Sequence, residues 1–271
     1  MRILAVVDAT GSLVDGTGAK AVALAGYVVD IATLIGYGIA GLLMWPSMRP
    51  VARTVLARQI LFTGYEAVPF VALLAALTAS TLVLQSQLGG LSADFLGQLM
   101  VVVLVRELGP LLLAMVVIAR SGSAIAVEMA NMRIGGEIQA LEWAGIDPFT
   151  YLVLPRLGGA CVSLVCLALL FIAFSLAGGF ALGMILAPST APDFDHFTAM
   201  LARNLTAVDA VEVLAKTIVP GLLIAAIATK EGMECALSVT AVPRATTRAV
   251  VRAIAAVAVW DALVTAVAVM G

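Results

Sequence analysis

The sequence predicts an all-α integral membrane protein with five transmembrane helices, an N-terminal interfacial helix and one short helix on the cytoplasmic face. Of its 271 residues, 62% are hydrophobic and only 12% are charged, and the mean hydropathy is +1.11. A soluble domain needs a far more polar surface than this composition supplies. The apolar stretches are also longer than the ~18 residues that a helix needs to cross a bilayer. The net charge of −2 gives no electrostatic support for a nucleic-acid partner.

The N-terminal part of the chain is predicted to stay on one side of the membrane. Residues 1–20 are polar and Gly-rich and lack the basic start and compact apolar core of a cleavable signal peptide, so we expect a flexible segment. Residues 21–45 are apolar but contain Asp30 and have positive charge at both ends. The flanking charges are Lys20, Arg49, Arg53 and Arg58. Because Lys and Arg favour the cytoplasmic side, residues 21–58 are predicted to form an interfacial or re-entrant helix and a cytoplasmic connection.

Residues 59–271 are predicted to form one membrane domain without a soluble module or an internal repeat. The five expected spans lie at about residues 67–84, 95–119, 157–187, 205–229 and 249–270. A Gly178-Gly179 pair predicts a break in the third span, because glycine is a poor helix former.

The distribution of Lys and Arg orients these spans. One set of connections holds Arg49, Arg53, Arg58, Arg120, Arg133, Arg156, Lys230, Arg244, Arg248 and Arg252. The opposite set, residues 85–94 and 188–204, holds only Arg203. The first set is therefore expected in the cytoplasm, and the C-terminus is expected on the outer side.

The polar stretch at residues 120–156 separates the second and third spans. Within it, Ile134, Ile138, Leu141 and Gly145 recur at steps of four, three and four residues. This period predicts a short amphipathic helix at about residues 134–145 on the cytoplasmic face. Such a helix suits docking into a groove on a soluble partner, although an ordinary interfacial loop helix has the same pattern.

Among the ionisable residues in the predicted spans, five are candidates for lining a cavity: Arg106, Glu107, Glu212, Lys216 and Asp261. Asp209 also lies in the first half of the fourth span. Arg106 and Glu107 precede Arg120 by 14 and 13 residues, which places them roughly 20 Å above the cytoplasmic face. Glu212 and Lys216 are spaced i,i+4 at a similar depth, and Asp261 lies near the middle of the membrane. Intramembrane charges commonly face a watered cavity on a transport path, and the alternative is that they pair with one another to fix helix packing.

Signatures of an enzyme or a metal site are missing from the sequence. The segment Gly16-Thr17-Gly18-Ala19-Lys20 lacks the Gly-Lys-Ser/Thr core of a phosphate-binding loop, and the single His196 has no catalytic companions. The three cysteines, Cys161, Cys166 and Cys235, lack metal-ligand spacing and are interpreted as reduced packing residues. We therefore expect no catalytic or metal site, and any ATP that drives transport must bind to another chain.

A series of motifs carries a resemblance to a known family. The motifs are Arg106-Glu107-Leu108-Gly109-Pro110, Ala119-Arg120-Ser121-Gly122-Ser123-Ala124, Glu128, Met132-Arg133, Glu137, Ala140-Leu141-Glu142, Asp147-Pro148, Pro155-Arg156 and Arg244-Ala245-Thr246-Thr247-Arg248. From about residue 60 to the C-terminus, the chain closely resembles the MlaE/YrbE family of ABC-transporter permeases. The order of the motifs makes this resemblance more specific than any one of them alone.

The resemblance implies a homodimeric permease in the bacterial inner membrane, with its C-terminus in the periplasm. It implies a cytoplasmic ABC ATPase that binds ATP and Mg, a periplasmic MCE-domain partner, and phospholipid or a related lipid as cargo. It further implies that Arg106 and Glu107 line the lipid cavity, to which the depth argument adds Glu212, Lys216 and Asp261. The helix at 134–145 would be the coupling helix to the ATPase, and its expected contact residues are Arg133, Ile134, Glu137, Ile138, Leu141 and Glu142.

Two other functions are compatible with the residues themselves. A secondary transporter driven by protons or sodium would use Glu107, Glu212 and Asp261 as ion carriers. A membrane scaffold would use the same charges only for packing. Copurification with an ATPase and with bound lipid distinguishes the three functions.

Overall fold

A computed structural model describes residues 16–43, 50–89, 93–186 and 194–270, and within these ranges it contains helices and no strand. The predicted all-α membrane class is confirmed, since six helices are long and apolar enough to cross a bilayer. The first of them, α2 (Gly16–Leu43), begins earlier than the predicted boundary at residue 21. The rest of the predicted flexible segment, residues 1–15, lies outside the described residues.

The helix that forms the first predicted span starts well before residue 67. The chain passes through α3 (Pro50–Thr63), a 3-10 turn (Tyr65–Ala67) and α4 (Val68–Gly89). Together these give an apolar helical run at Thr54–Gln85, part of which was assigned to a cytoplasmic connection. Gln59 lies in this run and packs against Gly159 of a neighbouring helix.

The second predicted span is the first part of a much longer helix. The segments α5 (Ala93–Met100), η3 (Val101–Glu107), α6 (Leu108–Val117), η4 (Ile118–Gly122) and α7 (Ser123–Ile134) follow one another without a turn, and η3 and η4 are π-helical. The apolar run Gly97–Ile134 has 38 residues, or about 57 Å of helix. Since the hydrocarbon core is about 30 Å thick, one end must project far beyond the bilayer.

The remaining helices complete an elongated bundle. They are α8 (Glu137–Trp143), η5 (Phe149–Val153), α9 (Leu154–Leu186), α10 (Phe194–Asn204), α11 (Ala207–Met233), η6 (Val239–Ala241) and α12 (Val242–Met270). The predicted break at Gly178-Gly179 is wrong, because α9 continues through both residues. Gly179 instead provides room for the side chain of Met100, so its small size serves packing.

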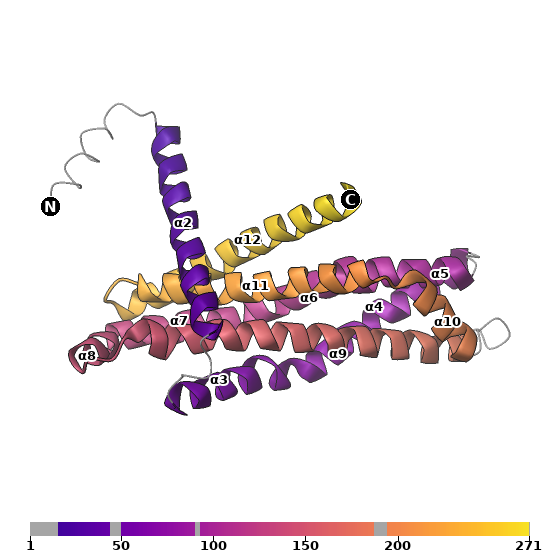
Figure 1. Cartoon of the computed structure of the whole chain (residues 1–271), viewed down its shortest axis with the longest axis horizontal. Coiled ribbons are helices and arrows are strands. Elements are labelled where there is room, and N and C mark those ends of the chain that lie inside the picture. The colour runs from indigo at the N-terminus through magenta and orange to yellow at the C-terminus, as the bar shows by residue number, and fades with distance from the viewer. Residues whose placement is uncertain (1–15, 44–49, 90–92, 187–193, 271) are drawn as a thin grey trace.

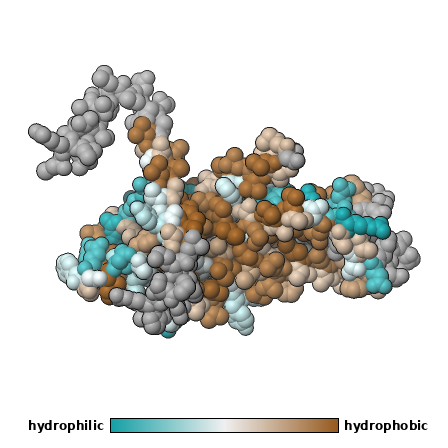
Figure 2. All heavy atoms as spheres, in the orientation of Figure 1, coloured by the Kyte–Doolittle hydropathy of each residue, from teal (hydrophilic) through white to brown (hydrophobic). Residues whose placement is uncertain are grey.

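The core lies between α9 and its neighbours α3, α4 and α11, which run along the length of the bundle in Figure 1. In Figure 2 the hydrophobic residues form a broad central zone, with hydrophilic residues gathered toward both ends of the long axis. This arrangement matches an apolar belt between two aqueous faces.

Helix α2 lies at a steep angle to the long helices, and its N-terminal part extends away from the bundle (Figure 1). Its C-terminal part contacts the start of the η5–α9 run. Gly38 lies against Leu157 of α9, and the ring centroids of Tyr37 and Phe149 are 6.3 Å apart. Near the middle of α2, the Asp30 carboxylate accepts a hydrogen bond of 2.9 Å from Lys230. All three partners are within about four residues of the ends of their helices, so α2 lies across one end of the bundle core.

Candidate functional site

A buried lysine is the centre of the candidate site. The side chain of Lys216 on α11 is only 1% exposed. Its ammonium lies 2.9 Å from the Glu107 carboxylate, 3.0 Å from that of Glu212 and 3.7 Å from that of Asp261. It also lies 2.8 Å from the hydroxyl oxygen of Thr265. Three carboxylates from three helical segments therefore surround one ammonium group.

The sequence around Pro110 explains how Lys216 gains a backbone acceptor. An α-helical residue at position 110 would donate its N–H to the carbonyl of residue 106, and proline has no N–H to donate. The Arg106 carbonyl instead accepts a hydrogen bond of 2.8 Å from Lys216. The π-helical segment that ends at Glu107 accommodates this change of hydrogen bonding.

Arg106 forms a second part of the site. Its Nε lies 2.6 Å from the Asp209 carboxylate, which is itself only 3% exposed. Asp209 also accepts hydrogen bonds from the backbone N–H of Thr206 at 2.6 Å and from the Thr206 hydroxyl at 3.0 Å, and so caps the start of α11. The carboxylate is therefore held in place by the helix start before it meets Arg106.

The structure brings together the five charged residues that were predicted to line a cavity. Arg106 and Glu107 lie on η3, Glu212 and Lys216 on α11, and Asp261 on α12. Two further members, Asp209 and Thr265, were not predicted. Their spacing could have identified them, because Asp209 precedes Lys216 by two helical turns and Thr265 follows Asp261 by one turn. We call these seven residues the Lys216 cluster.

Parts of the Lys216 cluster remain accessible. The side chains of Arg106 and Glu107 are 34% and 36% exposed, whereas those of Glu212 and Lys216 are buried. The indole of Trp260 donates a hydrogen bond of 3.0 Å to the Ala215 carbonyl and closes one side between α11 and α12. The cluster can thus present an arginine and a carboxylate to a ligand while its buried members hold both in place.

The predicted cytoplasmic helix is divided in two. Ile134 ends α7, and Gly136 adopts a positive φ of 73° before α8 begins at Glu137. Glycine suits this conformation because it lacks a Cβ. The helix predicted at 134–145 is therefore the shorter α8, and Arg133 and Ile134 belong to the preceding helix.

The apolar face of α8 packs partly on the chain itself. Ile138 and Leu141 are half-buried against a cluster that includes Ile125 and Met129. The expected contact of these two side chains with an ATPase stays a prediction, since both remain partly exposed. The accessible face of α8 carries Glu137, Gln139, Ala140, Glu142 and Trp143, and the Trp143 side chain is 89% exposed.

Polar contacts lie in the segments on either side of α8. Arg156, which is buried, lies 2.8 Å from the Glu128 carboxylate and donates a hydrogen bond of 2.7 Å to the Leu152 carbonyl. After α8, the Asp147 carboxylate accepts hydrogen bonds from the Thr150 hydroxyl at 2.6 Å and from the Thr150 N–H at 3.0 Å. The Thr150 hydroxyl is the main reason that the pKa of Asp147 lies below its ordinary value.

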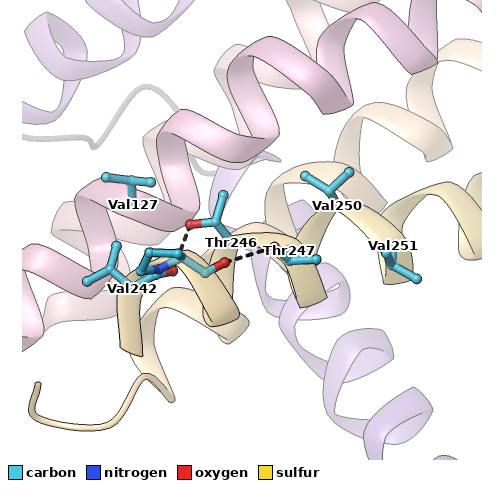
Figure 3. Close-up of a pocket in the computed structure, with 7 residues that line it drawn as sticks. Val127, Val242, Thr246, Thr247, Val250 and Val251 are labelled. Carbon is cyan, nitrogen blue, oxygen red and sulfur yellow. Dashed lines mark hydrogen bonds between the residues drawn. The ribbon is translucent and has the colours of Figure 1, made fainter. Parts of the chain in front are cut away.

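A separate apolar groove of about 510 Å³ lies between α7 and the start of α12. Figure 3 shows its lining residues, among them Val127 and Val250. The hydroxyls of Thr246 and Thr247 donate to carbonyls of their own helix at 3.0 and 2.9 Å. This groove contains none of the predicted site residues.

Comparison with known proteins gives consistent matches over most of the chain. A family model described as "Permease MlaE" matches residues 56–267. A probable ABC transporter permease protein of Rickettsia prowazekii is 33% identical over 222 residues, covering 80% of this chain and 83% of the relative. The intermembrane phospholipid transport system permease protein MlaE of Haemophilus influenzae is 30% identical over 173 residues, covering 64% of this chain and 65% of the relative.

Proposed function

Because the chain belongs to the MlaE permease family, we propose that it is the membrane subunit of an ABC transporter that moves phospholipid between the inner membrane and a periplasmic MCE-domain partner. The observation that carries the lipid assignment is the Lys216 cluster. It places an accessible arginine and an accessible carboxylate next to each other within otherwise apolar spans. A polar site of this kind inside a membrane protein suits the head group of an amphiphile, whose acyl chains favour the apolar surroundings.

The proposed orientation puts α8 in the cytoplasm and the Lys216 cluster in the outer half of the membrane. The Lys and Arg count supports this orientation, because the connections on the α8 side hold nearly all the positive charge. Residue pairs along α9 agree with it: Gly159 lies against Gln59 and Gly179 against Ala79, so α9 and the α3–α4 run point the same way. The C-terminus of α12 would then lie in the periplasm.

Helix α2 is proposed to lie in the cytoplasmic interface. Asp30, near its middle, contacts Lys230, which is close to the proposed cytoplasmic end of α11. If α2 crossed the bilayer upright, its middle would lie at the bilayer centre, about 15 Å from the cytoplasmic surface where Lys230 is proposed to lie. A helix lying flat satisfies both this contact and the contact of Tyr37 with Phe149.

The accessible face of α8 is proposed to contact a cytoplasmic ATPase that binds ATP and Mg. An exposed tryptophan flanked by carboxylates is a typical anchor for a protein interface, since aromatic residues dominate such contacts. Because Ile138 and Leu141 pack against a cluster that includes Ile125 and Met129, a displacement of α8 would be transmitted to α7. Transport then requires that lipid affinity differ between the two positions of the bundle.

The experiment is reconstitution of the homodimer with its ATPase and MCE partners, followed by transfer of labelled phospholipid. We expect ATP-dependent transfer, and Trp143→Ala should weaken ATPase copurification by about tenfold, corresponding to ~1.4 kcal/mol. Phe194→Ala, which removes an exposed aromatic at the opposite end of the bundle, is the control and should copurify normally. Unchanged copurification of the Trp143 variant would refute the α8 contact.

One observation favours a second function, an ion-coupled lipid or amphiphile transporter. Lys216 is surrounded by three carboxylates, which could carry protons or sodium. This function predicts lipid transfer without any ATPase, together with its collapse on addition of an ionophore. Transfer that requires ATP and is insensitive to ionophores rules it out.

A further inference from the structure

The Lys216 cluster has more negative than positive groups. Its carboxylates are Glu107, Asp209, Glu212 and Asp261, and its cations are Arg106 and Lys216. Four carboxylates against two cations leave a formal excess of two negative charges. An excess charge within a membrane is costly unless another positive group approaches it.

Lys216 cannot satisfy all of its neighbours. An ammonium group has three N–H donors, and four oxygen atoms lie within 3.0 Å of it. The Asp261 carboxylate is 3.7 Å from the ammonium, which makes it the most distant of the three carboxylates around Lys216. Asp261 is 17% exposed. Unused acceptor capacity is thus concentrated at Asp261, on the accessible side of the cluster that it shares with Glu107.

Arg106 supplies the complementary group next to this acceptor. Its Nε forms an ion pair with Asp209 but no hydrogen bond, and no partner of its two terminal nitrogens is found among the described residues. A guanidinium with free terminal nitrogens binds a phosphate through paired hydrogen bonds. Glu107 follows Arg106 in the chain, and both side chains are about one third exposed. The phosphate and the positive group of one lipid head group can therefore reach this pair together.

We propose that the Lys216 cluster selects lipids with an amine-bearing head group, whose ammonium binds Glu107 and Asp261 and whose phosphate binds Arg106. This inference rests on the proposed function and names the head-group class for that site. An anionic lipid without an amine would bring its phosphate to Arg106 and leave the excess negative charge uncompensated. The selectivity therefore depends on carboxylates and not on the shape of the acyl chains.

The test uses the full-length protein in nanodiscs with a photo-crosslinking residue at Leu108, an exposed apolar position adjacent to Glu107. Three probes with identical acyl chains are compared: phosphatidylethanolamine, its N-acetyl derivative and phosphatidylglycerol. We expect phosphatidylethanolamine to crosslink about five- to tenfold better than the other two probes. This ratio is what one additional charge-assisted hydrogen bond contributes to binding. Glu107→Gln with Asp261→Asn should reduce this preference to near parity.

Two controls make the result specific. Asp195→Asn removes an exposed carboxylate on α10 and should keep the full preference. Asp261→Asn alone keeps the Glu107 contact to Lys216 and should give an intermediate preference for phosphatidylethanolamine. This single variant replaces the double variant in the test if the double variant folds poorly.

Equal crosslinking of the three probes to the wild-type protein, or a preference for phosphatidylglycerol, would overturn the head-group inference and leave the lipid permease function intact. A preference that persists in a folded double variant would also overturn it. Absence of crosslinks to any lipid would instead refute the lipid cavity in the proposed function, and the head-group inference with it.

Discussion

Replacing Lys216 by methionine is expected to be among the most destabilising single changes in this chain. The side chain is 1% exposed, and its ammonium compensates the carboxylates of Glu107 and Glu212 at 2.9 and 3.0 Å. Methionine has a similar length and no charge, so the substitution removes the compensation without leaving a large cavity. Removing one partner of a buried ion pair costs about 3–5 kcal/mol, because the remaining charge stays buried.

The free energy lost depends on what the stranded carboxylates can do. The Glu212 carboxylate is buried and cannot reach water, whereas the Glu107 side chain is 36% exposed and can be partly hydrated. We therefore expect a loss near the lower end of this range, about 3 kcal/mol, or a fall in unfolding temperature on the order of 10 °C. Thermal unfolding of the purified protein in nanodiscs, followed by circular dichroism, measures this change.

A second substitution tests the electrostatic explanation. If stranded carboxylates cause the loss, Lys216→Met combined with Glu212→Gln should recover roughly half of it, because the amide is neutral. A Lys216→Met protein that unfolds within 2 °C of wild type would refute the reasoning. So would a double variant that is less stable than the single one.

Two further predictions concern the packing of α9 and the turn after α8. Gly221→Ala would place a Cβ 2.8 Å from the Cys161 Cα, so α9 and α11 must separate. We expect the free energy of unfolding to fall by about 1–3 kcal/mol in the same assay. Gly26→Ala is the control and should be tolerated, because its Cβ meets no atom within 4 Å. Hydrogen bonds from Thr150 lower the pKa of Asp147 below 3.8, so its contribution to stability is present above about pH 3.8 and is lost as the pH falls through the lowered value. Asp147→Asn should therefore be less stable than wild type at pH 7, and the two proteins should converge in acid; a constant difference would contradict this account.

Several features of the site were predictable because they depend on spacing along one helix. The pattern of Glu212 and Lys216, four residues apart, correctly placed both side chains on one face of α11. The depth expected for Arg106 and Glu107 likewise depends only on the helical rise between them and Arg120, and it stays a prediction. Neither argument could identify Asp209 as the partner of Arg106, because that contact joins two different helices.

The structure differs from the predicted helix at 134–145 in its bounds, because a turn interrupts the local apolar pattern. The apolar period through Ile134, Ile138 and Leu141 is real, but the positive φ of Gly136 divides the helix. The same apolar face has two candidate surroundings, a partner protein or the chain's own core. The structure shows that Ile138 and Leu141 pack partly on the chain's own core, which leaves Trp143 outward.

The sequence by itself determined that this is a helical membrane protein, and its Lys and Arg pattern predicts which connections face the cytoplasm. Both conclusions depend on quantities that are local in the chain, namely hydrophobic length and the positions of Lys and Arg. Only the tertiary structure decided which charges meet around Lys216, since Glu107 is 109 residues away in the chain and Thr265 is 49 residues away. Contacts over such separations depend on how the helices pack and on their rotation about their own axes, and no pattern within a single helix specifies these.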